Sequence, residues 1–329
     1  MPNQNTHSSY FSVVIPLYNK EKEIKRAIDS VLNQTFQDFE LIVVNDESTD
    51  NSLSVVESIQ DSRITIISQE NKGEFGARNT GIINSHAPYI AFLDGDDEWK
   101  PEFLETIYRL TLEFPQVGLY CTSRLYQYSS KSIRGKHTSG INRDGYGVIQ
   151  RPFLSWAEDR MAPMSCSSSV VPRKVFEKVG LFQLKRGAGG DWEMWCRILL
   201  HYQIAYAAKY MVLVHSEGKN RLSNIRSNLS MKEHYVTELF QREDNYIQEY
   251  MRAHSNDIER YLDFIEPVHL SLCINSGGDR REIMHIIHRI HHPFSYWKNI
   301  VYGIIMAHLP CRYRDLVSCT FLRIYNLFT

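Results

Sequence analysis

Two acidic clusters and one further aspartate are the residues of this sequence best suited to chemistry. The clusters are Asn45-Asp-Glu-Ser-Thr-Asp50 and Asp94-Gly-Asp-Asp97, and Asp191 follows the glycine-rich turn Gly187–Gly190. Carboxylates can hold a divalent cation through their oxygen atoms, or take a proton from a reacting hydroxyl group. The alternative is that each cluster is a solvated turn, where Asp and Gly are common. The elements around the clusters decide between these interpretations.

Apolar runs predict four strands in the first hundred residues, and residues at helical spacing predict the helices between them. The strands are Phe11–Pro16, Phe39–Val44, Arg63–Ser68 and Tyr89–Leu93, and the helices are Glu23–Leu32, one through Leu53, Val56 and Ile59, Gly76–Ser85, and one that opens at Pro101. This alternation indicates an α/β fold with a mostly parallel sheet flanked by helices. Ligands bind outside the carboxyl ends of such strands, and both acidic clusters lie there.

The remaining chain is less regular. We expect a loop over Tyr126–Arg151, a strand end and short helix over Val170–Gly180, and a helix over Trp192–Leu200. Helical patterns over Met231–His254 and Ile258–Cys273 follow, without strand signals. The sequence therefore predicts an α/β domain over residues 1–223 and a helical C-terminal extension over 224–329.

Composition limits the classes of function. A formal net charge of -1 over 329 residues gives no global field for nucleic acid, so we expect no nucleic-acid partner. The six cysteines lack paired spacing, which favours a reduced, cytoplasmic setting. The polar N-terminus has no apolar core of a signal peptide, and no apolar run reaches transmembrane length.

Six segments, in the expected order, resemble the GT-A (Rossmann-like) glycosyltransferases of family 2, of the bacterial polysaccharide-biosynthesis type. They are Ser12-Val-Val-Ile-Pro-Leu-Tyr-Asn19, Ser30-Val-Leu-Asn-Gln-Thr-Phe36, Val43-Val-Asn-Asp-Glu-Ser-Thr-Asp50, Asn71-Lys-Gly-Glu-Phe-Gly-Ala-Arg-Asn-Thr-Gly81, Phe92-Leu-Asp-Gly-Asp-Asp97 and Asp191-Trp-Glu-Met-Trp195. The resemblance covers residues 12–223. It implies an inverting, metal-dependent transfer of a sugar from a nucleotide-sugar donor, a UDP-sugar, to an acceptor hydroxyl.

The resemblance also assigns the second acidic cluster. Asp94-Gly95-Asp96 matches the family's Asp-x-Asp metal motif, with Asp96 as the direct ligand of Mn²⁺ or Mg²⁺ and Asp94 nearer the donor ribose or sugar. Asp97 is an alternative to either. A cation there would neutralise the charge that develops on the leaving diphosphate. His215 stands where some relatives supply a further metal ligand, although a lone histidine at a strand end is more often structural.

The donor nucleotide has four further candidate contacts. Asp46 matches the residue that recognises the base, and Pro16 and Tyr18 lie in the opening segment, where a ring often stacks on the base. Tyr18 could instead form the core edge. Arg78 matches a residue that approaches the diphosphate, or else makes a surface salt bridge on its helix. Asn45 and Glu47 depart from the usual Asp and Gly, which makes the loop bulkier.

Asp191 matches the catalytic base of the family, which takes the proton of the acceptor hydroxyl. Capping the following helix is the alternative role, and the two are compatible. The family commonly has Glu-Asp here, whereas this chain has Gly190-Asp191 and lacks the helper carboxylate. Trp192 and Trp195 line an acceptor pocket or belong to the core. Arg221 and Ser223 resemble a loop that closes over the diphosphate.

The C-terminal region has no part in the resemblance. Basic and aromatic residues surround the short apolar run Ile300–Leu309, which suits peripheral contact with the inner face of the plasma membrane. A helical cap or a homo-oligomer contact is the alternative. By analogy, the acceptor is a saccharide or lipid-linked saccharide of a cell-surface polysaccharide. The rival functions are a non-catalytic sugar- or lipid-binding scaffold and a nucleotidyltransferase; a GxGxxG dehydrogenase motif is absent after the first strand.

Overall fold

The computed structural model describes residues 9–128, 131–135, 138, 141, 145–159, 162–184, 190–215, 239–240, 242–275 and 280–289. Within them, ten strands form one sheet in the order β3-β2-β1-β4-β9-β6-β10-β5, with β7 paired to β6 and β8 to β10. The strands are β1 (Phe11–Leu17), β2 (Phe39–Asp46), β3 (Ile64–Gln69), β4 (Tyr89–Phe92), β5 (Glu98–Trp99), β6 (Leu119–Tyr128), β7 (Lys131–Arg134), β8 (Tyr146–Ile149), β9 (Ser169–Pro172) and β10 (Ile204–His215).

The predicted parallel part of the sheet is confirmed. Strand β1 pairs in parallel with β2 on one side and β4 on the other, and β3 continues the parallel order beyond β2. The carboxyl ends of these strands therefore meet at one edge. Strand β9 is antiparallel to both β4 and β6, while β6 and β10 are again parallel.

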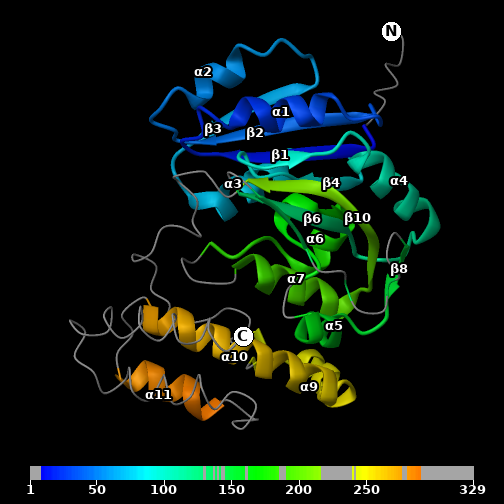
Figure 1. Cartoon of the computed structure of the whole chain (residues 1–329), viewed down its shortest axis with the longest axis vertical. Helices are drawn as coiled ribbons and strands as arrows, with labels where there is room; N and C mark the ends of the chain where they lie inside the picture. Colours follow the sequence, from blue (N-terminus) through cyan, green and yellow to red (C-terminus); the bar gives the residue numbers. More distant parts are fainter. Residues whose placement is uncertain are drawn as a thin grey trace. The chain divides into compact units, whose positions relative to one another are not determined.

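Helices cover both faces of the sheet. They are α1 (Ile24–Leu32), α2 (Ser52–Glu57), α3 (Gly73–Asn84), α4 (Phe103–Glu113), α5 (Pro152–Asp159), the 3₁₀ helix η1 (Cys166–Ser168), α6 (Arg173–Val179) and α7 (Gly190–His201). Helices α1, α2 and α4 share a core with alternate β1 residues such as Val13 and Ile15, whereas α3 contacts the opposite face through Ala77. Figure 1 shows α1 lying over the parallel strands.

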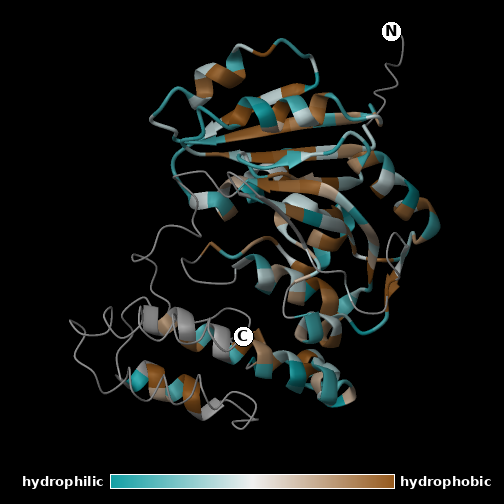
Figure 2. Cartoon of the chain, in the orientation of Figure 1, coloured by the Kyte–Doolittle hydropathy of each residue, from teal (hydrophilic) through white to brown (hydrophobic). Residues whose placement is uncertain are grey.

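The local sequence explains these layers. The buried residues of α1 are Ile24, Ala27, Ile28 and Val31, one stripe at helical spacing, while Lys25 and Asp29 pair on its outer side. The central strands are apolar on both faces, as expected for parallel strands between helices. Figure 2 shows the hydrophobic colour concentrated in these strands and the hydrophilic colour in the surrounding loops and outer helix faces.

The expected loop over Tyr126–Arg151 is wrong in part. Strand β6 extends to Tyr128, and β7 and β8 lie within the expected loop and pair with β6 and β10. Polar residues inside β6 hid the strand: Thr122, Ser123 and Arg124 are buried, and they carry their own hydrogen-bond partners. The short strand β5 was also not predicted.

The chain forms two compact units, Met1–Leu184 with Gly190–Arg221, and Lys185–Gly189 with Leu222–Thr329. The predicted domain boundary near Ser223 stays a prediction, because this residue lies outside the described ones. The second unit contains α9 (Asn245–Ala253), α10 (Ser255–Asn275) and α11 (Arg280–Arg289). Helix α10 contacts α9 and α11. The predicted continuous helix Met231–His254 is wrong in its described part, since residues 242–244 interrupt it.

No helix in the described part of the chain is long and apolar enough to cross a membrane. The apolar run Ile300–Leu309, and with it the predicted membrane contact, lies outside the described residues. In α11, Ile283 and Ile286 are buried while His285 is exposed, which agrees with a half-solvated helix face.

Candidate active site at the carboxyl edge of the sheet

The loop Asp94–Asp97 joins β4 to β5 at the predicted edge, and η1 holds it in shape. The hydroxyl oxygen of Ser167 accepts a hydrogen bond from the backbone N–H of Asp94 (3.2 Å), and this hydroxyl donates to Oδ2 of Asp97 (2.6 Å). The carbonyl of Ser167 in turn accepts a bond from Trp99 Nε1 at 2.7 Å. One oxygen of the buried Asp97 is thus bound by Ser167 of η1, whereas the side chain of Asp94 is partly exposed.

Asp96, the predicted metal ligand, binds a cationic side chain of the protein. Nζ of Lys20 lies 2.8 Å from Oδ2 of Asp96, and the two side chains are 13% and 8% exposed. Arg26 of α1 also donates to the carbonyl oxygen of Asp96 at 2.7 Å. The position beside Asp96 therefore accommodates a positive charge away from bulk water.

Two predicted residues meet where this loop passes the end of β1. A Cβ atom at Gly95 would stand 3.3 Å from the carbonyl oxygen of Pro16 and 3.6 Å from Ile24. Glycine thus lets the acidic loop approach the β1 backbone closely.

Arg78 lies in α3 and forms ion pairs with two carboxylates. Its Nη2 is 2.6 Å from Asp94 Oδ1 and 3.4 Å from Glu74 Oε2, and its side chain is only 3% exposed. The alternative prediction for Arg78 was a salt bridge at the protein surface. The ion pairs exist, but the surface location is wrong, because the guanidinium is buried. Its Nε and Nη1 have no hydrogen-bond partner among the described residues, and the rings of Phe75 and Phe182 lie 5.5 and 5.9 Å from it.

Asp191 stands in the first turn of α7 and belongs to the same charged group. Burial raises its pKa, the Arg78 guanidinium opposes that effect, and the Asp94 carboxylate adds to it. Burial likewise raises the pKa of Glu74, with Arg78 opposing and Asp94 and Asp191 contributing. Three predicted residues (Arg78, Asp94 and Asp191) and the unpredicted Glu74 are thus electrostatically coupled. A carboxyl group with a raised pKa is suited to proton transfer.

The first acidic cluster ends β2 at the same edge. Asp46 is buried, and its Oδ1 accepts hydrogen bonds from Gln69 Nε2 (2.6 Å) and the backbone N–H of Lys72 (2.9 Å). Tyr18, directly after β1, is 46% exposed, which places its ring at the surface and not in the core. Asn19 Oδ1 accepts from the backbone of Thr49 at 2.8 Å, so the loops after β1 and β2 are joined.

His215, expected as a further metal ligand or a structural residue, lies at the end of β10 and contacts Glu98. Its Nε2 lies 3.1 Å from Oε2 of Glu98, two residues beyond Asp96. Among the residues that the structure describes, no group of three or more His, Cys, Asp or Glu side chains could hold a metal ion by itself. Trp195 is fully buried beside Phe182, which favours the core interpretation for this residue. Arg221 and Ser223 lie outside the described residues.

Sequence reasoning missed Lys20, Glu74 and Ser167. Lys20 follows Tyr18-Asn19 in the loop after the first predicted strand, and this position alone could have suggested a cation near the acidic edge. Glu74 lies four residues before Arg78, at the spacing of a helical ion pair. Nothing in the sequence points to Ser167, because its contacts span about 70 residues.

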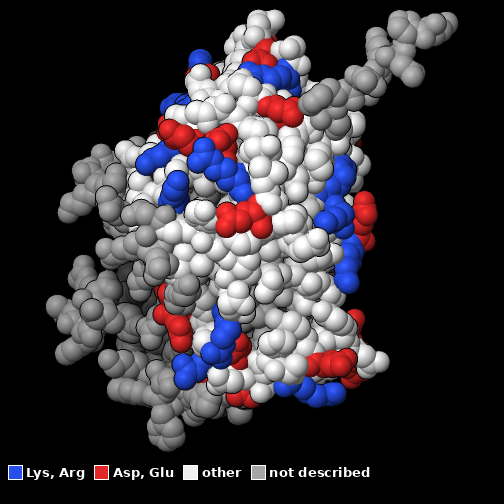
Figure 3. Space-filling view, turned by 90° about the vertical axis from the view of Figure 1, so that its right-hand side faces the viewer, with Lys and Arg blue, Asp and Glu red and all other residues white. Residues whose placement is uncertain are grey.

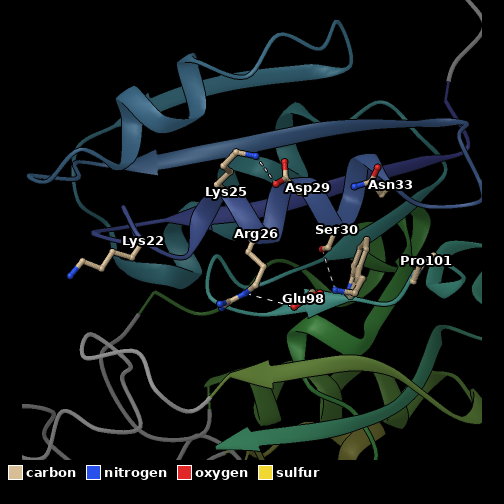
Figure 4. Close-up of a pocket in the computed structure, with 9 residues that line it drawn as sticks. Lys22, Lys25, Arg26, Asp29, Ser30, Asn33, Glu98 and Pro101 are labelled. Atoms are coloured by element: carbon tan, nitrogen blue, oxygen red, sulfur yellow. Dashed lines mark hydrogen bonds and ion pairs between the residues drawn. The ribbon is translucent and has the colours of Figure 1, made fainter. Parts of the chain in front are cut away.

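A groove of about 520 Å³ lies along α1 and borders the candidate residues, because Arg26 and Glu98 of its lining also contact Asp96 and His215. Figure 4 shows it between α1 and β5, with Lys25 paired to Asp29 and Arg26 directed at Glu98. None of its lining residues is a predicted site residue, and its cations are paired within the groove or exposed. On the face shown in Figure 3, acidic and basic side chains are interspersed and form no broad field of one sign.

Comparison with known proteins finds relatives that are named as glycosyltransferases. The family model described as "Glycosyl transferase family 2" matches residues 12–180. An uncharacterized glycosyltransferase of Nostoc sp., alr2836, is 31% identical over 67% of this chain and 66% of its own length. The succinoglycan biosynthesis protein ExoW of Rhizobium meliloti is 32% identical over 64% of this chain and 68% of its own. The matched region thus spans about two thirds of these relatives.

Two solved structures share the fold. S. aureus TarS 1-349 in complex with UDP-GlcNAc has a TM-score of 0.59 at 15% identity, covering 89% of this chain and 90% of that one. The mannosyltransferase PcManGT of Pyrobaculum calidifontis, in complex with GDP-Man and Mn²⁺, has a TM-score of 0.55 at 15% identity, covering 92% and 86%.

Proposed function

Because the chain belongs to glycosyl transferase family 2, we propose that it transfers a sugar from a UDP-sugar to an acceptor hydroxyl with inversion. The observation that supports this most is the meeting of Asp94, Arg78 and Asp191 in one charged group at the edge where Asp46 and Asp96 also lie. TarS was solved with UDP-GlcNAc and PcManGT with GDP-Man, which supports a nucleotide-sugar donor. Asp46 favours uracil, since a carboxylate accepts the imide N–H of that base.

Asp191 acts as the base in this proposal. The acceptor oxygen forms a bond to the anomeric carbon while the bond from that carbon to the diphosphate oxygen breaks, and its electron pair leaves with UDP. Asp191 takes the proton that the acceptor hydroxyl loses. Direct displacement by this route inverts the configuration, because attack and departure occur on opposite faces of the carbon.

Arg78 serves the leaving group. It is buried beside Asp94, and two of its nitrogen atoms have no partner among the described residues. Diphosphate oxygen atoms can satisfy such donors with charge-assisted hydrogen bonds. The guanidinium then carries a fixed positive charge that stabilises the departing UDP.

The residues present fit a divalent cation shared with the donor. Asp96 pairs with the Lys20 ammonium, and this supports a place for positive charge beside its carboxylate. Asp96 would hold Mn²⁺ or Mg²⁺ once Lys20 moves aside, with the diphosphate and water completing the oxygen ligands. The cation would supply Lewis-acid neutralisation of the diphosphate. We propose His215, whose Nε2 lies 3.1 Å from Glu98, as a secondary ligand.

The acceptor and the setting are further parts of the proposal. One relative is named for succinoglycan biosynthesis, which supports a saccharide or lipid-linked saccharide of a cell-surface polysaccharide as acceptor. We place the enzyme in the cytoplasm, against the inner face of the plasma membrane. Residues 224–329 would then contact the acceptor, the membrane surface or a second copy of the chain.

Thermal stabilisation by UDP, GDP and other nucleoside diphosphates, with and without Mn²⁺, tests the donor site. A ligand at one hundred times its Kd adds about 2.7 kcal/mol to the stability of the folded state. We expect a Mn²⁺-dependent shift with UDP that Asp96→Ala abolishes and that Asp29→Asn, an exposed control in α1, retains. If no nucleotide shifts the wild-type protein in either condition, the scaffold interpretation replaces this one.

Turnover separates an enzyme from a binding protein. Release of UDP from a panel of UDP-sugars measures it even with water as acceptor. Asp191→Asn keeps the size of the side chain and removes the base, so it should keep the UDP shift and lose turnover. Unchanged turnover in this variant would contradict the assigned role of Asp191.

A further inference from the structure

The segment that follows α6 is held from the side of α3 by one amide side chain. Asn79 Nδ2 donates to the carbonyl oxygen of Phe182 at 2.8 Å, and its Oδ1 accepts from the backbone N–H of Phe182 at 2.9 Å. Asn79 is only 8% exposed. A side chain that satisfies both backbone groups of one residue acts as a strand partner would, and fixes that residue in position and orientation.

Helix α7 holds the same segment from the other side. Arg197 donates through Nη2 to the carbonyl oxygen of Leu181 (2.9 Å) and through Nη1 to the carbonyl oxygen of Val179. Its Nε bonds to Oε1 of the fully buried Glu193 at 2.7 Å. Residues 179–182 are therefore tied to α3 and to α7 at once, by directed hydrogen bonds in a buried environment.

Both helices carry a residue of the candidate active site. Arg78 immediately precedes Asn79 in α3, and Asp191 lies in the first turn of α7, the helix that carries Arg197. The ring of Phe182 lies between the two helices: it stacks on Phe75 of α3 (5.6 Å, 9°) and meets Trp195 of α7 edge-on at 6.0 Å. The segment thus bridges the leaving-group side of the site and the base side.

The proposed reaction requires a fixed spacing between the two sides of the site. In a direct displacement, the base and the leaving group must face each other across the anomeric carbon. A misplacement of about 1 Å can lower the rate about a hundredfold even where binding persists. Two helices packed only by apolar side chains could slide by such a distance, whereas hydrogen bonds at 2.8 to 2.9 Å leave little freedom.

We propose that Asn79 is a positioning residue, which sets the spacing between Arg78 and Asp191 by gripping the backbone of Phe182. It acts through the bridge and contacts neither donor nor acceptor. The inference rests on the proposed transferase function and adds a determinant of its rate outside the set of charged residues.

The test compares Asn79→Ala with Asn84→Ala. Asn84 lies on the exposed side of the same helix and donates to the carbonyl of Thr80 within it, so it controls for the loss of an amide from α3. UDP release from the best UDP-sugar of the panel gives kcat and KM, and UDP-induced thermal stabilisation reports donor binding. For Asn79→Ala we expect kcat to fall about 10- to 100-fold, with the KM for the donor and the UDP shift nearly unchanged. Asn84→Ala should match the wild type.

Arg197→Lys provides a second variant that acts from the side of α7. Lysine keeps the charge beside Glu193 but cannot reach two carbonyl groups at once. If Asn79→Ala is too unstable to assay, Arg197→Lys replaces it in the test. We expect Arg197→Lys to lower kcat in the same way. Wild-type kcat in either folded variant, or a parallel loss of UDP binding and kcat, would overturn the positioning role. Failure of the proposed function is distinct, because the wild-type protein itself would then neither bind nor release UDP.

Discussion

Replacing Gly190 with alanine would test how closely the start of α7 fits against α3. A Cβ atom at this position would stand 2.8 Å from Cζ of Phe75, and nearer still to Cε2. The Phe75 ring cannot easily turn away, because it stacks on Phe182 and lies against the Arg78 guanidinium. Overpacking of this kind costs about 1–3 kcal/mol. Gly190 is the first residue of α7, where alanine gains little from its helix propensity, so we expect a net loss of about 1–3 kcal/mol.

Urea denaturation of a double-mutant cycle measures this contact. Phe75→Ala removes the obstructing ring, so Gly190→Ala should be neutral or stabilising in that background, with a coupling energy of about 1–3 kcal/mol. Gly147→Ala is the control, because its Cβ would meet Ile141 at an ordinary 3.4 Å. The same loss for Gly190→Ala with and without the Phe75 ring would refute the reasoning, and so would no loss in the wild-type background.

Three further predictions concern charge. Burial raises the pKa of Asp191, and this residue must be ionised to act as the base. As the pH is lowered, turnover should therefore begin to fall at a higher pH than the pKa of an ordinary aspartate would predict, which a pH–rate profile of UDP release checks. Arg63 lowers the pKa of Asp61 from 3.8 to about 2. Asp61→Asn should therefore cost about 1 kcal/mol at pH 7, a loss that fades between pH 4 and 2 in denaturation curves. Lys20→Met removes the cation that competes for Asp96 and should strengthen Mn²⁺ binding about tenfold in calorimetry with UDP present.

The GT-A fold predicted from the sequence is confirmed, and its first half was the more predictable part. Strands such as Phe39–Asp46 contain a run of apolar residues (Leu41–Val44), and α1 carries one apolar stripe, so local pattern and tertiary burial agree. Strand β6 could not be predicted from an apolar pattern. Its buried Arg124 looks like a surface residue in the sequence, and only the folded chain supplies the carbonyl of Ala162 and the hydroxyl of Tyr126 that its guanidinium needs.

The candidate site divides along the same line. Its carboxylates were predictable, because each one follows a recognisable strand or precedes a recognisable helix, and parallel strands bring their carboxyl ends together. Their specific long-range pairings were not, although the position of Lys20 after the first strand indicates a cation near this edge. Lys20 meets Asp96 across 76 residues and Asn79 meets Phe182 across 103, distances at which sequence spacing carries no information. Pairing of this kind depends on loop geometry, which single-sequence patterns do not specify.

The departures from the family pattern are each matched by a local contact, and this argues against decay of the site into a scaffold. Glu47, in place of glycine, adopts a φ of 61° and accepts a hydrogen bond from the backbone of Asn71 at 3.3 Å. Asn45, in place of aspartate, bonds to the backbone N–H of Ser48 at 3.1 Å. Gly190, in place of glutamate, leaves the space that the ring of Phe75 fills. The changes lie in the donor-nucleotide loop and before the catalytic base, so we interpret them as an adjustment of these two segments around Asp46 and Asp191.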